Sequence, residues 1–302
     1  MILSISALAA GLALLTVAAD RSVLSAARLS AHFGMSPILI GALVIGLGTS
    51  IPELVVSLVA GEPAESMGNV IGSNISNLTL VLGTAALLRV LHVPRALVRS
   101  QGVLMAVAMA ALALVLVDGE IARIEGLALL MGAVLVYTLL IRRSETPQPG
   151  EPSKHEDVAV GIELIAAPLA LVITVGGAWL LVWSAERLAD DIGLTSAFVG
   201  LVILAVGTSL PEFATAIAAA RRDEPGLITG NVIGSNIFNS LVVGGSAGLA
   251  HPGSAGGLGG ATILMVVIVA LAALLSGRIG RLERWDGLIL LVGFAGLIAV
   301  SL

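Results

Sequence analysis

The stretch that decides the fold reads GLGTSIPE at residues 46–53, and it is followed by GNVIGSNISN at residues 68–77. Together the two stretches place a carboxylate, a proline, amides and hydroxyls inside an apolar run. The chain repeats the pattern as AVGTSLPE at residues 205–212 and GNVIGSNIFN at residues 230–239. Polar side chains are costly in such surroundings, so their repetition indicates a functional site.

The composition is that of a membrane protein. Of the 302 residues, 57% are hydrophobic and 12% are charged, whereas a soluble domain carries about 25% charged residues. The apolar runs are continuous over about 20 residues, long enough for helices that cross a bilayer, and they do not alternate as barrel strands do. Cysteine is absent, which excludes disulfides, thiolate catalysis and cysteine metal sites.

Ten apolar segments are predicted, and they make the chain an all-α polytopic membrane protein. In order, they are 2–27, 37–60, 67–90, 97–117, 122–141, 159–185, 196–219, 226–249, 259–276 and 286–302. No basic residues precede the first segment, which is therefore read as a retained helix and not as a signal peptide. A polar linker at 144–157 separates a first half, 1–143, from a second half, 158–302.

The basic residues predict the orientation in the cell membrane. Connections after odd-numbered segments hold 13 of the 15 Lys and Arg residues, and the other two are Arg123 and Arg187. Cytoplasmic connections collect positive charge, so the odd connections and the linker are expected in the cytoplasm and both termini outside it. The acidic residues at segment ends are expected to form a solvated rim: Asp118, Glu120, Asp190, Asp191, Asp223, Glu283 and Asp286.

The two copies of the motif are predicted to lie in opposite orientations. Residues 41–83 align with 200–245, with Glu53 matching Glu212 at an offset of 159 and later positions matching at an offset of 162. We place the three additional residues of the second copy in its connecting loop. Five segments separate equivalent positions, and because five is odd the second copy enters the membrane from the other side. Inverted repeats are typical of transporters with a substrate site near the membrane midplane.

The first motif combines a helix break with oxygen ligands. Pro52 lacks an N–H and clashes with the carbonyl of Gly48, so the helix is expected to break there and free carbonyl oxygens. These carbonyls, the hydroxyls of Thr49 and Ser50 and the carboxylate of Glu53 form an oxygen cluster. Such clusters are what hard cations such as Ca²⁺ and Na⁺ require.

The second motif brings further oxygens to the first. Ser73 and Asn77 share a helical face, and Gly68 and Gly72 form a small-residue seam that allows close approach to Glu53. Each part has an alternative interpretation, because glycine seams usually serve packing, a lone serine can bond the backbone and a lone proline can simply kink a helix. A mid-membrane carboxylate in both copies is different, since such a residue is functional by default.

The motifs GTSIPE and GTSLPE, each followed by GNVIGSN, resemble the α-repeats of the cation/calcium antiporter superfamily, and most closely those of prokaryotic sodium/calcium exchangers. The resemblance implies ten helices in two inverted five-helix repeats, a central site for one Ca²⁺ or three Na⁺, and alternating access by sliding of the first and sixth helices. The ligands that it implies are the side chains of Glu53, Glu212, Thr49, Ser50, Thr208, Ser209, Ser73, Asn77, Ser235 and Asn239 and the carbonyls of Gly46 and Ala205.

One position departs from the family pattern. Many exchangers carry an aspartate where this chain has Asn239, so the site here holds two formal negative charges, from Glu53 and Glu212. Two carboxylates match one Ca²⁺ or two Na⁺, which leaves the Na⁺ stoichiometry open. The proton-coupled branch carries a Gly-Asn-x-x-Glu motif that this chain lacks, and this favours Na⁺ over H⁺.

The sequence therefore predicts a secondary antiporter that exchanges Na⁺ for Ca²⁺ through one alternately exposed site. Exchange driven by H⁺, transport of another divalent ion, a cation channel and an intramembrane enzyme remain as alternatives. The enzyme is disfavoured because no nucleophile–histidine pair accompanies the glutamates. No cofactor, nucleic acid or obligatory protein partner is expected besides the transported ions and the lipid bilayer.

Overall fold

The computed structural model describes residues 2–60, 62–144, 160–191 and 207–301. The helices in these ranges are α1 (Ile2–Phe33), α2 (Pro37–Ile40), α3 (Leu47–Thr49), α4 (Ile51–Val59), α5 (Pro63–Ser76), α6 (Leu82–Leu88), α7 (Arg95–Leu97), α8 (Val103–Val115), α9 (Arg123–Ser144), α10 (Val160–Asp191), α13 (Leu210–Arg222), α14 (Pro225–Ile237), α15 (Gly244–Ala250), α16 (Gly259–Ile279) and α17 (Arg284–Ser301). The wider π-helical segments are η1 (Gly41–Gly46), η2 (Asn77–Val81), η3 (Val98–Gly102) and η5 (Phe238–Val243).

Eight helical runs of the described residues are long and apolar enough to cross a membrane. They are Leu3–Phe33, Pro37–Val59, Pro63–Leu88, Arg95–Val115, Arg123–Arg143, Val160–Ala185, Pro225–Ala250 and Gly259–Arg278. α17 occupies the tenth predicted segment, and α13 lies in the seventh, whose first part falls outside the described residues. The chain is thus an all-helical polytopic membrane protein, and α1 is longer than predicted because it continues to Phe33.

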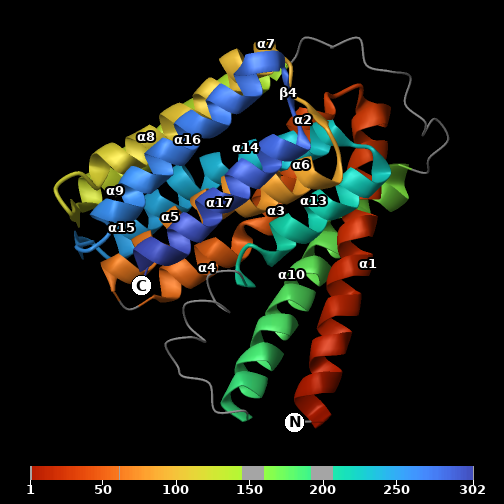
Figure 1. The fold of residues 1–302 in the computed structure, drawn as a ribbon, viewed down its shortest axis with the longest axis horizontal. Helices are drawn as coiled ribbons and strands as arrows, with labels where there is room; N and C mark the ends of the chain where they lie inside the picture. The colour runs from red at the N-terminus through yellow and green to blue at the C-terminus, as the bar shows by residue number, and fades with distance from the viewer. Residues whose placement is uncertain (1, 61, 145–159, 192–206, 302) are drawn as a thin grey trace.

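Two helical runs, α5–η2–α6 and α14–η5–α15, form the centre of the molecule. In each run, 78% of an apolar stretch of 18 residues is buried. Large side chains such as Ile71 and Ile228 are fully enclosed there. α8, α9, α16 and α17 lie around this centre (Figure 1). Their outer faces expose apolar side chains such as Leu114, Val134 and Val292, as expected for helices that contact lipid.

α1 and α10 lie side by side and project from this bundle (Figure 1). Glycines make their contact close: a Cβ atom at Gly11 would lie 2.9 Å from the nitrogen of Leu181, and one at Gly177 would lie 2.6 Å from the nitrogen of Leu15. Small residues let helix backbones approach in this way in membranes. The two long helices therefore form one paired unit at the edge of the fold.

The two-residue strands pair across the two halves of the chain. β1 (Leu91–His92) pairs with β4 (Arg281–Leu282), and β2 (Glu120–Ile121) pairs with β3 (Gly253–Ser254), both antiparallel. The start of β3 follows that of β1 at an offset of 162, and the start of β4 follows that of β2 at an offset of 161. Each pair is therefore the counterpart of the other, within one residue of the offset of 162 that relates the later positions of the sequence motifs.

Two close helix contacts follow the same relation. A Cβ atom at Gly287 on α17 would lie 2.6 Å from the oxygen of Gly83 on α6, and one at Gly126 on α9 would lie 2.7 Å from the oxygen of Gly245 on α15. Gly245 follows Gly83 at an offset of 162, and Gly287 follows Gly126 at an offset of 161. The two halves of the chain thus hold each other through two equivalent contacts.

The prediction that the second copy has a longer loop is wrong. α13 has 13 residues whereas its counterpart α4 has 9, and the connection after α13 is the shorter one. Residues 214–220 are alanine-rich, and alanine has the highest helix propensity, so the additional residues extend the helix.

The prediction that acidic residues at segment ends are exposed to solvent is correct for three of them and wrong for Asp286. Asp118, Glu120 and Asp223 are exposed, whereas Asp286 is only 1% exposed. Its Oδ1 pairs with Arg278 at 3.2 Å, and its Oδ2 accepts a hydrogen bond from the backbone nitrogen of Glu283 at 2.8 Å. Neighbouring helices bury this carboxylate, and its burial is tolerated because it caps the first turn of α17 and pairs with Arg278. The side chains of Asp190 and Asp191 lie outside the described residues.

Candidate cation-binding site

The helices break at two equivalent points. Ser50, between α3 and α4, has φ −88° and ψ 7°, and Ser209, just before α13, has φ −85° and ψ 4°. Both values fall in the bridge region and not in the helical region. Pro52 and Pro211 then occupy the first turns of α4 and α13, where a missing N–H is tolerated. The expected break is therefore present in both copies.

The glutamates follow directly after these breaks, and both are completely buried. The hydroxyl of Ser50 donates a hydrogen bond to Oε1 of Glu212 at 2.8 Å. Three of the four carboxylate oxygens, both of Glu53 and Oε2 of Glu212, accept no hydrogen bond from the described residues. The two glutamates interact electrostatically with each other. Their position at the first turns of α4 and α13 places negative charge at the positive ends of the helix dipoles.

Residues of the second copy bond to the break in the first. The hydroxyl of Ser235 on α14 donates to the carbonyl of Gly46 at 3.2 Å, and the hydroxyl of Thr49 donates to the carbonyl of Ile45 at 2.9 Å. A Cβ atom at position 46 would lie 2.9 Å from the nitrogen of Ser235, so this approach requires glycine. Gly46, Thr49 and Ser235 therefore place their oxygens together in the structure.

The packing interpretation is correct for two glycines of the second copy. Gly230 and Gly234 on α14 lie against the backbones of Ile38 and Ala42 with no space for a side chain. Gly72, the counterpart of Gly234, has no described atom within 4 Å of its Cβ position. The seam thus brings α14 against η1.

Asn77 and Asn239 lie at equivalent places on the two central runs. η2 begins at Asn77, and Asn239 is the second residue of η5. Both side chains are completely buried, and neither their oxygens nor their nitrogens have a hydrogen-bond partner among the described residues. π-helical turns inside α-helices are often found at functional sites. These amides are therefore free to coordinate a ligand.

The other predicted ligands are placed unevenly. Ser73 on α5 is buried and interacts with Glu53. Ser209 is buried and its hydroxyl has no hydrogen-bond partner among the described residues, whereas Thr208 is half-buried. Ala205, whose carbonyl was a predicted ligand, lies outside the described residues. No group of three or more His, Asp or Glu that could hold a metal was found in the described part of the chain.

Two asparagines next to the site, Asn69 and Asn231, were not among the residues predicted from the sequence. The amide nitrogen of Asn69 donates to the carbonyl of Glu53 at 3.1 Å, and that of Asn231 donates to the carbonyl of Glu212 at 3.4 Å. Each amide also donates to a hydroxyl about one turn after the glutamate on the helix of that glutamate, Ser57 on α4 or Thr215 on α13. The asparagines match each other at the offset of 162, which is the signal that relates them to the ligand positions. They hold the backbone from which each glutamate projects.

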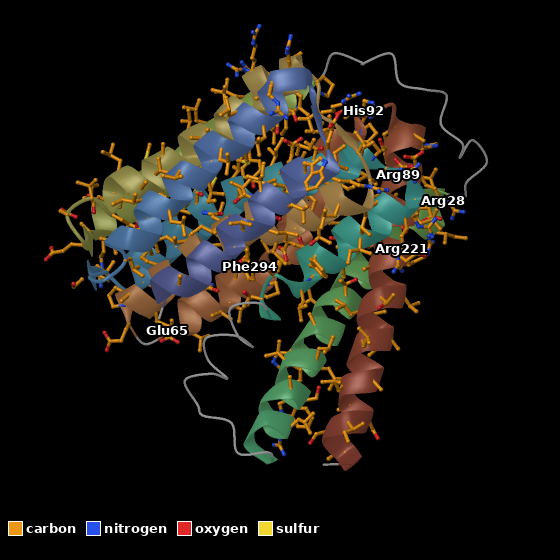
Figure 2. The ribbon with its side chains drawn as sticks, viewed as in Figure 1. Arg28, Glu65, Arg89, His92, Arg221 and Phe294 are labelled. Carbon is orange, nitrogen blue, oxygen red and sulfur yellow. The ribbon has the colours of Figure 1, made fainter. Side chains whose placement is uncertain are left out.

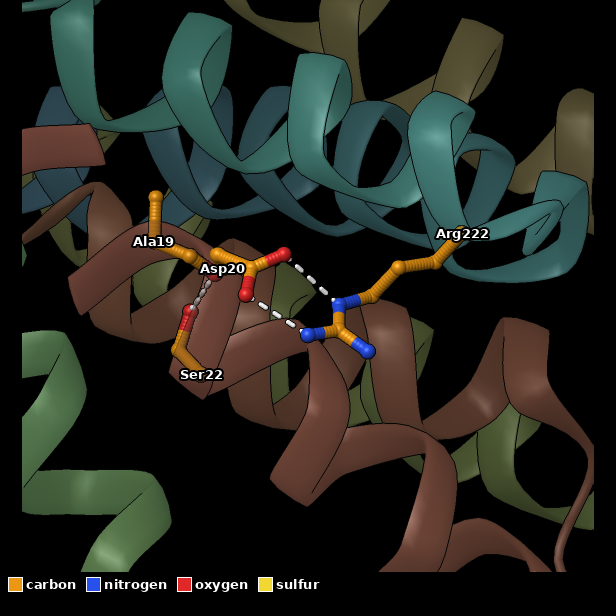
Figure 3. Close-up of polar contacts among 4 residues, drawn as sticks. All are labelled: Ala19, Asp20, Ser22 and Arg222. Carbon is orange, nitrogen blue, oxygen red and sulfur yellow. Dashed lines mark hydrogen bonds and ion pairs between the residues drawn. The ribbon is translucent and has the colours of Figure 1, made fainter. Parts of the chain in front are cut away.

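A second polar cluster joins α1 to its neighbours. Glu163 on α10, which the sequence analysis also missed, is buried and pairs with Arg21 at 2.9 Å and with Arg28 at 2.7 Å. Asp20 on α1 accepts two hydrogen bonds from the guanidinium of Arg222 on α13, at 2.7 and 2.6 Å (Figure 3). α1 is thus tied to α10 by one set of charges and to the bundle by another.

Comparison with known proteins identifies the family. The model of the family described as "Sodium/calcium exchanger protein" matches residues 3–142 and 163–302. Inner membrane protein YrbG of Escherichia coli (strain K12) is 36% identical over 265 residues, which cover 84% of this chain and 82% of that protein. Sodium/calcium exchanger MaX1 of Methanosarcina acetivorans is 27% identical, with 96% of each chain covered. A solved structure of the sodium-calcium exchanger NCX_Mj, soaked with Na⁺ and Sr²⁺, aligns with a TM-score of 0.88 and 29% identity, covering 99% of this chain and 98% of that one. The chain therefore belongs to the sodium/calcium exchanger family of membrane antiporters.

Proposed function

We propose that this protein exchanges Na⁺ for Ca²⁺ through one midplane site in which Glu53 and Glu212 bind either ion. The observation that carries the proposal is the burial of two carboxylates at two helix breaks, with three oxygens unpaired among the described residues. Buried carboxylates are costly unless positive charge compensates them. Cations are therefore the natural ligands, and competition between Na⁺ and Ca²⁺ for the same oxygens couples their movements.

Neutral oxygens complete the proposed site. They surround the carboxylates with the oxygen ligands that Ca²⁺ and Na⁺ prefer and add no charge. The proposed set is the side chains of Thr49, Ser50, Ser73, Asn77, Thr208, Ser209, Ser235 and Asn239 and the carbonyls of Gly46 and Ala205.

The proposed architecture is ten transmembrane helices in two inverted repeats, 1–143 and 158–302, joined by a cytoplasmic linker at 144–157. The strand pairs between the halves and the paired glycine contacts support it, because each has a counterpart at the repeat offset. Figure 2 shows Arg28, Arg89 and Arg221 toward one end of the molecule and Glu65 at the other. This separation agrees with a basic cytoplasmic end and with both termini on the outer side.

Flux measurements on the purified protein in liposomes test the proposal. A Na⁺ gradient at clamped pH is expected to drive Ca²⁺ uptake. Uptake under a pH gradient but not under a Na⁺ gradient would show coupling to H⁺ instead. Single-channel currents through the purified protein would refute antiport and show that the protein is a cation channel.

Glu53→Gln tests the site itself. Loss of one of two site carboxylates is expected to reduce Na⁺-driven Ca²⁺ uptake by about 100-fold or more, since a buried charge pair contributes several kcal/mol. The matched control is Glu65→Gln on the exposed start of α5, which is expected to leave uptake unchanged. Normal uptake by a folded Glu53→Gln protein would refute the site assignment.

A further inference from the structure

We propose that exchange is electroneutral, with two monovalent cations moved for each Ca²⁺, and that the uncharged amides Asn77 and Asn239 set this ratio. The inference rests on the proposed function and adds its stoichiometry. It holds for either monovalent driver, because Na⁺ and H⁺ carry the same charge.

The charge of the site comes from two groups. Glu53 and Glu212 are buried without a cationic partner among the described residues. The other buried carboxylates of the described residues, Glu163 and Asp286, are each paired with arginine. The undescribed residues 192–206, which precede the second break, contain no Asp, Glu, His, Lys or Arg. The site therefore carries two negative charges.

Burial then limits which sets of cations the site can hold while the protein changes from one side of the membrane to the other. An uncompensated charge at the membrane midplane costs several kcal/mol, so the loaded site is stable when its net charge is zero. One Ca²⁺ gives zero, and so do two monovalent cations. A third monovalent cation would leave one positive charge buried and unpaired. The loaded site is thus neutral in each half of the transport cycle, and the full cycle moves no net charge across the membrane.

The two amides are the positions at which this balance can change. Asn77 and Asn239 are completely buried, match each other in the two repeats and keep all four polar atoms unpaired among the described residues. Asparagine ligates cations through its oxygen without adding charge. By contrast, Asn74 and Asn236 on the same helical runs are bonded through their nitrogens, to Ser240 at 2.9 Å and to Val232 at 2.6 Å.

A null-point measurement on the full chain in liposomes decides the ratio. With a roughly tenfold Na⁺ gradient, two-for-one exchange balances a roughly hundredfold Ca²⁺ gradient, and the balance is the same at zero potential and at about 100 mV set with K⁺ and valinomycin. Three-for-one exchange would balance roughly a thousandfold gradient at zero potential. In three-for-one exchange the Ca²⁺ gradient at balance would also shift by about 50-fold per 100 mV of membrane potential. Either result would overturn the inference.

Failure of the proposed function gives a different result. If a Na⁺ gradient moves no Ca²⁺, Na⁺ coupling is refuted, and the same null point measured with a pH gradient still tests the two-for-one ratio. A potential-independent ratio supports electroneutral exchange in either case.

Asn239→Asp tests the role of the amide. It adds one carboxylate with little change of shape and is expected to make the null point depend on potential. Asn239→Ser, the matched control, removes the amide without adding charge and is expected to stay electroneutral with weaker binding. A folded, active Asn239→Asp protein that stays electroneutral would refute the role of this position. If Asn239→Asp fails to fold, Asn77→Asp and the wild-type ratio remain decisive.

Discussion

The two glutamates are equivalent in sequence but not in their contacts. Glu212 accepts a hydrogen bond from Ser50, whereas Glu53 accepts none from the described residues. Both have their backbone carbonyl held by an asparagine, Asn69 or Asn231. The backbone from which each of these side chains projects is thus held in place. Fixed supports of this kind are what precise coordination requires.

Removing one support is expected to weaken binding without altering the ion ratio. Asn231→Ala deletes hydrogen bonds to the Glu212 carbonyl and to Thr215, each contributing about 1 kcal/mol, so the apparent KM for Ca²⁺ should rise by up to roughly 30-fold. The null point should stay the same because the charge of the site does not change. Thr138→Ala, on the exposed face of α9, serves as the control. An unchanged KM would mean that the asparagine serves packing alone.

At the scale of elements, α1 and α10 behave as a pair. Glycine contacts and the buried Glu163 hold them together, whereas the ion pair between Asp20 and Arg222 joins α1 to α13. Both partners of that ion pair are partly exposed, so its contribution to stability is small, about 1 kcal/mol or less. α13 carries Glu212 in its first turn, so the ion pair connects the two edge helices with the helix of the site.

Breaking this ion pair is expected to change transport more than stability. Asp20→Asn and Arg222→Gln should each alter the maximal rate of Na⁺-driven Ca²⁺ uptake several-fold in the same direction, with the unfolding midpoint shifted by a few degrees at most. The double variant should match the single variants, because the three proteins lack the same interaction. Additive effects of the two substitutions on the rate would argue against a direct coupling.

At the scale of the whole molecule, the chain is two halves joined by contacts that come in equivalent pairs. β1 and β3 are counterparts at the repeat offset, and each pairs with a strand of the other half. If the repeats are inverted, these two strands lie on opposite sides of the membrane.

The absence of cysteine makes this arrangement testable in cells. His92→Cys in β1 and Ser254→Cys in β3 both place a thiol at an exposed position of a chain that has no other. We expect an impermeant thiol reagent outside intact cells to label Ser254→Cys and not His92→Cys, and the reverse from inside-out vesicles. Labelling of both from one side would refute the inverted repeats.

Local chemistry made the two helix breaks, with a glutamate after each, predictable from the sequence. Proline, glutamate and serine each indicate a break or a ligand, and the repeat shows which of them belong together; the structure has the breaks at Ser50 and Ser209. The part that could not be predicted depends on distant pairing. Glu163 meets Arg28 across 135 positions of sequence, and nothing near either residue identifies the partner. Asp286 looked like an exposed segment end because burial by neighbouring helices leaves no local mark.

The contacts between the halves bear on how such a chain can have arisen. Gly83 packs on Gly287, Gly126 packs on Gly245, and both strand pairs take one strand from each half. A half-length chain would leave all of these surfaces without a partner. A second copy of the same half would supply a partner for every one of them. If the repeats are inverted, such pairing implies as ancestor an antiparallel homodimer of one half, later fused after gene duplication.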